Sequence, residues 1–217
     1  MTQALIVALA YWVLILVYRF GANSMADQPI VVGPVVGLLL GDLQTGVLIG
    51  AALQIMYLGV VNVGGAQSTD TLYATCMAVA LATMTNIGTD AAIALSIPLG
   101  YIGLLMLQVT RIFFALCVPT LDKVAEEGNR TKYDIFYIGH NIIGYGFGAI
   151  TIFIALAAGA DATQAFINTL PAWIMGGLKV AAGLLPAIGL GIILNMMWDN
   201  KKIIYFILGF ALVAYLN

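Results

Sequence analysis

The chain has 217 residues, of which 62% are hydrophobic and only 8% are charged, and its mean hydropathy is +1.04. Water-soluble domains carry about 25% charged residues, so this composition excludes an ordinary soluble protein. The formal net charge of -2 provides neither the basic surface of a nucleic-acid-binding protein nor a polybasic patch for a membrane surface. We therefore expect an integral membrane protein that binds no nucleic acid.

The N-terminal part of the chain predicts one membrane helix followed by a helical hairpin. Residues 4–21 form an apolar run without the basic start of a cleaved signal peptide. Residues 29–61 are also apolar, but Pro and Gly divide them into two pieces of about 12 to 16 residues, each too short to cross a bilayer. Such pieces are typical of a re-entrant hairpin. We assign its turn and its close packing to Gly33, Pro34, Gly37, Gly41, Asp42 and Gly46.

The rest of the chain predicts further helices around one hydrophilic stretch. Apolar runs follow at residues 71–87, 91–119, 135–160 and 181–198. The basic residues of DKVAEEGNRTKYD favour a cytoplasmic loop at about 120–134. We expect an all-α, polytopic protein with broken helices and a single transmembrane domain, 1–217. Pro- and Gly-rich composition near both ends allows an inverted repeat, and the short last run is consistent with a polypeptide that continues beyond Asn217.

No motif for catalysis or metal binding is present in the sequence. It contains no catalytic triad pattern, P-loop, GxGxxG or HExxH motif, and the single histidine, His140, has no catalytic partner in its own segment. A hydrogen-bonded structural role for His140 is favoured over phosphoryl or proton transfer. Cys76 and Cys117 lack a second ligand at metal spacing. We expect no catalytic residue, no metal site and no cofactor.

The stretch GGAQSTDTLYAT, residues 64–75, places polar side chains between apolar runs. A carboxylate at membrane depth costs a few kcal/mol and therefore indicates a function. Carboxamides, hydroxyls and a carboxylate interleaved with Gly supply both donors and acceptors, as an uncharged sugar requires. Capping of the helix that starts near Thr71 is the structural alternative, and both roles can coexist. The candidate substrate contacts are Gln54, Asn62, Gln67 and Asp70, with Ser68 and Thr69 as secondary contacts.

Residues 29–70 resemble the signature region of the membrane C subunit of the mannose/fructose/sorbose family of the bacterial phosphoenolpyruvate-dependent sugar phosphotransferase system. The matching positions are Gly41, Asp42, Gly46, Leu58, Gly59, Asn62, Gly64 and Asp70, together with NMM at 195–197. The sequence departs from the family pattern at Gln28, where Arg is usual, at Gln54, where Glu is frequent, and at Thr69, where Pro is usual. These departures leave the fold assignment intact and the identity of the sugar open.

The resemblance implies a subunit of the bacterial cytoplasmic membrane that binds a hexose-like sugar and passes it inward. It also implies a D subunit in the membrane, a trimer of C–D pairs, and cytoplasmic A and B subunits that supply the phosphoryl group. Two alternatives remain open on the residues. One is an ion-coupled secondary transporter of a small polar solute with Asp42 or Asp70 as ion ligand, and the other is a non-transporting membrane scaffold or receptor.

Overall fold

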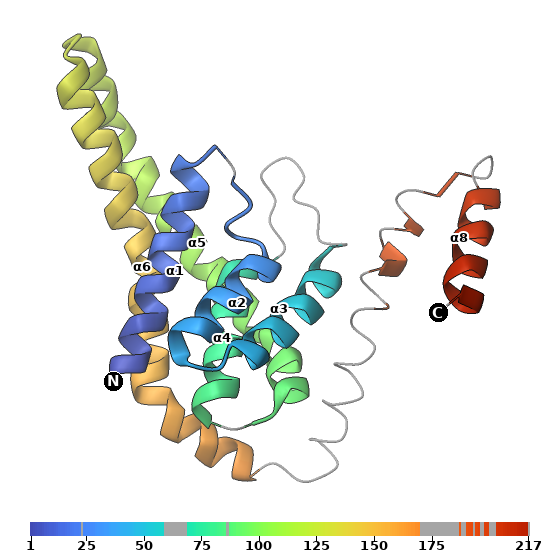
Figure 1. Ribbon diagram of the computed structural model, residues 1–217. Coiled ribbons are helices and arrows are strands. Elements are labelled where there is room, and N and C mark those ends of the chain that lie inside the picture. The colour runs from blue at the N-terminus through green and yellow to red at the C-terminus, as the bar shows by residue number, and fades with distance from the viewer. Residues whose placement is uncertain are drawn as a thin grey trace.

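The chain is built from α-helices. The computed structural model describes residues 1–22, 24–58, 69–85, 87–169, 187, 190–192, 194–195, 198–199 and 203–216. Its helices are α1 (Thr2–Phe20), α2 (Pro29–Leu40), α3 (Leu43–Tyr57), α4 (Thr71–Thr85), α5 (Thr89–Glu126), α6 (Arg130–Thr169) and α8 (Ile203–Leu216), as Figure 1 shows. The described residues contain no strand, and the predicted all-α class is confirmed.

The helices fall into two length classes. Within the described part of the chain, α1, α5 and the portion of α6 up to Ala157 are long and apolar enough to cross a membrane. The 12 residues of α2 reach only about 18 Å, which is less than the roughly 30 Å of a hydrocarbon core. α3 and α4 are short apolar helices as well. The structure thus combines full spans with half-spans, as the interrupted apolar runs predict.

The α2–α3 hairpin closes through local turn chemistry and packs through glycine. Gly41 ends α2 in the left-handed conformation (φ 85°), and the Asp42 side chain accepts a hydrogen bond from the Thr45 amide at 3.0 Å to begin α3. A Cβ atom on Gly37 would lie 2.8 Å from the Cα of Gly46, so the two backbones are in contact. Gly33 faces Gly46 and Gly50 in the same way. Larger side chains at these positions would separate the two helices.

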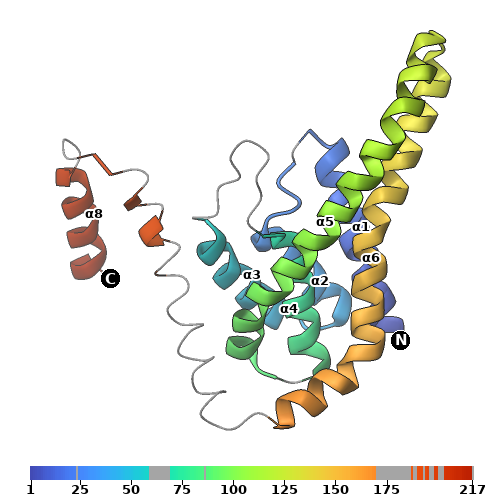
Figure 2. The same cartoon turned by 180° about the vertical axis from the view of Figure 1, so that it is seen from behind.

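α4 forms the centre of the described bundle. It packs against α1, α2, α3, α5 and α6, and in both Figure 1 and Figure 2 it lies between the α2–α3 hairpin and the long helices. Most of its side chains are buried. The hydroxyls of Thr75 and Thr85 donate to carbonyl oxygens one turn earlier, at 2.7 and 2.6 Å, so their burial leaves no unsatisfied donor.

The α5–α6 pair extends further than the sequence predicts. α5 continues through Pro119 to Glu126 and α6 begins at Arg130, so the expected loop at about 120–134 is helical except for a short turn at Gly128 (φ 66°). The two helices project together beyond α1 to α4 at the upper left of Figure 1. The charged residues of this stretch are exposed to solvent, as expected, but they lie on helices and not in a loop. An ion pair one helical turn apart, Arg130–Asp134 at 3.7 Å, lies within this extension.

Candidate functional site

The predicted substrate contacts lie on both sides of segment 59–68. Gln54 lies near the end of α3, and Thr69 and Asp70 lie directly before α4. Asn62, Gln67 and Ser68 lie outside the described residues. The described part of the site is therefore formed by two clusters, one around Gln54 and one around Asp70.

Asp70 holds the start of α4 and joins it to two other helices. Its side chain is only 3% exposed. Oδ1 accepts a hydrogen bond from the Tyr73 amide at 3.0 Å, which makes Asp70 a cap of α4. Oδ2 accepts a longer bond of 3.4 Å from the Tyr11 hydroxyl on α1, and the Asp70 amide donates to the Gly100 carbonyl on α5 at 3.1 Å. The carboxylate at membrane depth thus has defined partners.

Close backbone approach surrounds the Asp70 cluster. A Cβ atom on Gly103 of α5 would lie 2.8 Å from the Cβ of Asp70, and one on Gly148 of α6 would lie 2.6 Å from the Tyr11 hydroxyl. Gly100 packs directly against the hydroxyl of Thr69. The glycines at these positions of α5 and α6 allow the two helices to approach Asp70 and Tyr11 closely.

The Thr69 hydroxyl is the one buried side-chain oxygen or nitrogen in the described residues that has no hydrogen-bond partner among them. The Tyr57 hydroxyl interacts with Thr69, but its geometry favours the carbonyl and hydroxyl oxygens of Ser96, both at 3.4 Å. An unpaired buried hydroxyl costs about 1–3 kcal/mol. The Thr69 hydroxyl can therefore gain from a better-placed partner than Tyr57.

Gln54 belongs to a second cluster at the open end of the α2–α3 hairpin. Its Oε1 accepts a hydrogen bond from the Ile30 amide at 3.2 Å, and its Nε2 donates to Gln28 Oε1 at 3.1 Å. Gln28 in turn donates from Nε2 to Asp27 Oδ1 at 3.5 Å. Asp27 lies in the α1–α2 connection, and its partial burial raises the pKa of its carboxyl above the usual value. A backbone hydrogen bond, the bond from Gln28 and the charge of Arg19 reduce this rise but do not cancel it. Gln28 and Gln54, two of the positions where the sequence departs from the family pattern, are thus in contact.

The two clusters belong to one region. Both clusters flank segment 59–68 in the chain, and α2, α3 and α4 pack together. Among the described residues, Gln28, Gln54 and Thr69 offer carboxamide and hydroxyl groups at the ends of these helices. These groups can both donate to and accept from the hydroxyls of an uncharged polar ligand.

Sequence reasoning missed several of these contributors. Tyr11 lies inside an apolar run and is 59 residues from Asp70, so only its hydroxyl within a membrane helix could have indicated a polar partner. Asp27 lies in the connection between α1 and α2, and its local sequence does not indicate that it ends the hydrogen-bonded series that includes Gln54. The contact between Gln28 and Gln54 spans 26 residues and leaves no local pattern.

The ring nitrogens of His140 contact residues of its own helix, α6. Nδ1 lies 2.9 Å from the Phe136 carbonyl, and Nε2 lies 3.3 Å from the Asn141 amide nitrogen. The first contact requires a proton on Nδ1, and the Asn141 amide can donate to Nε2. The ring also stacks on Phe136 and meets Phe114 edge-on. This environment favours a structural role for His140. Arg111 contacts Gln108, and Lys179 lies outside the described residues.

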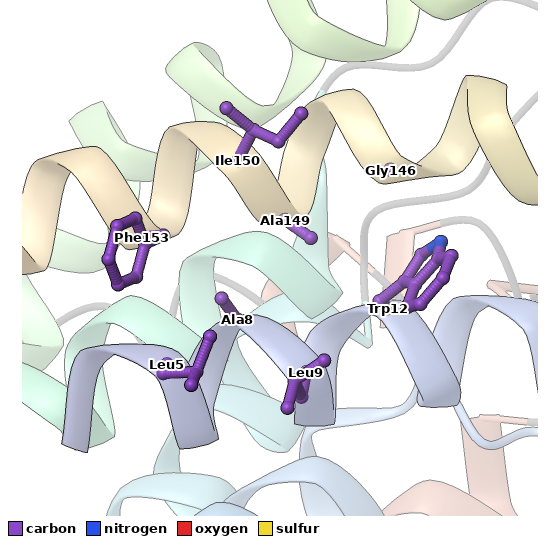
Figure 3. A pocket seen from close by; sticks show the side chains of 8 residues that line it. All are labelled: Leu5, Ala8, Leu9, Trp12, Gly146, Ala149, Ile150 and Phe153. Atoms are coloured by element: carbon purple, nitrogen blue, oxygen red, sulfur yellow. The ribbon is translucent and has the colours of Figure 1, made fainter. Parts of the chain in front are cut away.

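A groove of about 350 Å³ between α1 and α6 has a different chemistry, as Figure 3 shows. Its lining side chains are Leu5, Ala8, Leu9, Trp12, Gly146, Ala149, Ile150 and Phe153. The indole N–H of Trp12 donates to the Ile142 carbonyl at 2.9 Å and is already satisfied. An apolar groove of this kind has no groups that could orient the hydroxyls of a sugar.

Comparison of the whole sequence with protein families identifies one match. The family described as "PTS system sorbose-specific iic component" matches residues 1–217. Among individual relatives, the chain is 32% identical to N-acetylgalactosamine permease IIC component 1 of Escherichia coli K12, over 88% of this chain and 71% of the relative. It is 29% identical to the mannose-specific EIIC component of the same strain, over 91% of this chain and 76% of the relative.

Solved structures agree with this match. The chain is similar to one described as "Structure of membrane protein", with a TM-score of 0.88, 27% identity, and coverage of 100% of this chain and 88% of the other. It is also similar to a chain in the complex of the mannose transporter ManYZ with microcin E492, with a TM-score of 0.68, 26% identity, and coverage of 100% and 87%. The resemblance carried by residues 29–70 is therefore confirmed over the whole chain. The chain belongs to the sorbose-type IIC family, the sugar-translocating, multi-pass subunits of phosphotransferase systems in the bacterial cytoplasmic membrane.

Proposed function

We propose that the chain binds a hexose-like sugar in the region between Gln54 and Asp70 and passes it inward for phosphorylation by a B subunit. The observation that supports this proposal is that two polar clusters, one around Gln54 and one around Asp70, flank segment 59–68, which contains Asn62, Gln67 and Ser68. The relatives carry names for mannose, sorbose, fructose and N-acetylgalactosamine, which supports a hexose or a close derivative as the substrate.

Each described residue has a specific capacity to bind a sugar. Gln54 uses one N–H and one lone pair within the protein, so one N–H and one lone pair remain for a sugar hydroxyl. The unpaired hydroxyl of Thr69 would gain its missing partner from the substrate or from segment 59–68. Asp70 accepts bonds on both carboxylate oxygens and retains further lone pairs. Its main contribution would be to hold the end of the segment in place.

The proposed partners are those that the family resemblance implies. A ManYZ complex among the similar structures supports a D subunit in the membrane. Cytoplasmic A and B subunits would supply the phosphoryl group, and the C–D pairs would assemble as a trimer. Phosphorylation removes free sugar at the inner face, so uptake would proceed without a coupled ion. This scheme assigns no catalytic side chain and no cofactor to the chain itself.

The test is uptake of labelled hexoses by cells that produce the chain with its D partner. We expect uptake of one sugar class that requires the general phosphotransferase proteins. Thr69→Val should raise the KM about 3- to 10-fold, since one hydrogen bond is worth about 0.5–1.5 kcal/mol. Thr83→Val is the matched control, because its hydroxyl bonds only to carbonyls of its own helix. Uptake that persists without the phosphotransferase proteins and collapses with the ion gradient would establish the ion-coupled alternative instead.

A further inference from the structure

Asp27, Gln28 and Gln54 form a hydrogen-bonded series that runs in one direction. The Ile30 amide donates to Gln54 at 3.2 Å, Gln54 donates to Gln28 at 3.1 Å, and Gln28 donates to Asp27 at 3.5 Å. The side chains of all three residues are partly buried. We refer to this series as the glutamine clasp.

The two ends of the clasp determine the orientation of both carboxamides. A backbone N–H can only donate, so Gln54 must turn its oxygen toward Ile30 and its NH₂ toward Gln28. An ionised carboxylate can only accept, so Gln28 must turn its NH₂ toward Asp27. Neither amide can flip without placing two donors or two acceptors against each other. Hydrogen bonds that point the same way also polarise one another and become stronger.

Among the described residues, the clasp provides the side-chain hydrogen bonds that join the start of α2 to the end of α3. Ile30 lies in the first turn of α2, where backbone amides lack partners within the helix. Gln54 lies in the last turn of α3, directly before segment 59–68. The backbones of the two helices already touch here, since a Cβ atom on Gly50 would lie 2.6 Å from the Pro29 carbonyl. The clasp therefore adds side-chain hydrogen bonds to the backbone contact that already holds the start of α2 against the end of α3.

We infer that Gln28 is a positioning residue of the sugar site, which with Asp27 holds the Gln54 carboxamide in the one orientation that presents its free N–H and lone pair to the substrate. This inference rests on the proposed function, because it specifies how Gln54 is prepared for binding. Gln28 itself need not touch the sugar. Its exchange should change the affinity for the sugar through Gln54.

The donor and acceptor requirements make the clasp testable by paired exchange. Gln28→Arg alone replaces an acceptor with a group that only donates, so the Gln54 NH₂ loses its partner. Gln54→Glu alone removes the donor to Gln28 Oε1 and places a carboxylate oxygen against that acceptor. In the double variant the guanidinium can donate to both carboxylates, while Glu at position 54 still accepts from the Ile30 amide. The double variant should restore the series.

The experiment measures the KM and Vmax of sugar uptake for both single variants and the double variant, produced with the D partner. It also measures the thermal midpoint of each purified C–D complex. We expect each single variant to raise the KM at least 10-fold with little change in Vmax. The double variant should have a KM well below the additive expectation, although Glu at position 54 lacks the N–H that the Gln54 carboxamide offers to the sugar, so the native KM is not fully regained. Gln44→Glu is the matched control, because Gln44 is an exposed carboxamide in the same hairpin and should leave the KM unchanged.

The remaining outcomes each count against a specific claim. Single effects on the KM that simply add in the double variant would overturn the inference, because independent sites are additive. Coupling in the thermal midpoint without coupling in the KM would also overturn it, since the clasp would then be structural only. If the native chain with its D partner takes up no hexose while the thermal midpoints still couple, the clasp exists but the proposed function fails.

Discussion

The two helical hairpins of this chain differ in length, in backbone packing and in the chemistry of their turns. The α2–α3 hairpin is short, turns at Gly41 and Asp42, and brings its backbones into contact at glycines. The α5–α6 hairpin has helices of 38 and 40 residues, or about 57 and 60 Å, and turns at Gly128 among exposed charges. The first can remain within the bilayer beside the polar clusters, and the second exceeds the thickness of a hydrocarbon core. Close backbone packing at glycines therefore holds the first hairpin together. The second hairpin is distinguished by the length of its helices and by the charged residues at its turn.

The largest effect is expected from a side chain placed between the helices of the short hairpin. In Gly46→Leu the new Cβ would lie 2.8 Å from the Cα of Gly37, and backbone cannot move away without opening the hairpin. We expect a loss of more than about 3 kcal/mol of stability, at or above the upper range for overpacking. The thermal midpoint and the amount of assembled complex in the membrane measure it.

Gly139→Ala provides the contrast on the long hairpin. A Cβ atom at Gly139 has no neighbour within 4 Å, and alanine is the better helix former. Stability should stay the same or increase by about 0.5–1 kcal/mol. Equal destabilisation by Gly46→Leu and Gly139→Ala would contradict the distinction between the hairpins.

The second effect concerns Asp70, which holds α4 between the two hairpins. Asp70→Ala removes a helix cap and leaves the Tyr73 amide and the Tyr11 hydroxyl without an acceptor. We expect a loss of about 2–4 kcal/mol, measured on the purified complex without sugar so that binding does not contribute. Asp70→Asn keeps an acceptor for the cap and should lose less. Equal stability of the alanine variant and the native chain would show that the cap is dispensable.

A smaller effect is expected at the contact that joins α5 to α6. The Thr110 hydroxyl donates to the Gly144 carbonyl at 3.0 Å while also bonding to Met106 in its own helix. Thr110→Val keeps the shape and removes the bond between helices, which within membranes is worth about 0.6 kcal/mol on average. A thermal midpoint shift of a few degrees at most is the expected result. Dissociation of the complex would mean that this hydroxyl contributes more than an ordinary bond between helices.

The smallest effect is expected at the charged end of the long hairpin. Arg130 and Asp134 form an ion pair 3.7 Å long whose side chains are 94% and 54% exposed. Exposed pairs contribute little because water and salt screen them. Arg130→Gln should leave the thermal midpoint within experimental error at physiological salt. A clear loss of stability that disappears at high salt would reveal a partner charge on another subunit.

Local chemistry explains which parts of the fold were predictable from sequence. Pro29 and the Gly41–Asp42 turn predicted the bounds of the short hairpin, because a proline at a helix start and a left-handed glycine act within a few residues. The continuous helices through residues 120–134 were not predicted, because hydrophilicity reports exposure to water and not backbone conformation. Pro119 also suggested an end to α5 that the surrounding helix overrides.

In the candidate site, too, the features that depend on local sequence were predictable and those that depend on tertiary contacts were not. The sequence indicated Gln54, Thr69 and Asp70 because polar groups are rare among apolar runs. It could not reveal that Tyr11 donates to Asp70, since that contact depends on how α1 packs against α4. The clasp is of the same kind, because the two glutamines meet only after the hairpin has closed.

The hydrogen bond from Trp12 to Ile142 also bears on the order of events during biosynthesis. It joins residues 130 positions apart, so at roughly 5–20 residues per second α1 waits on the order of ten seconds for α6 to be made. During that interval α1 must persist in the bilayer without α6, for which a predominantly apolar helix of 19 residues is long enough. α2 and α3, each too short to do so, have their partner next to them in the chain and can pair almost as soon as they are synthesised.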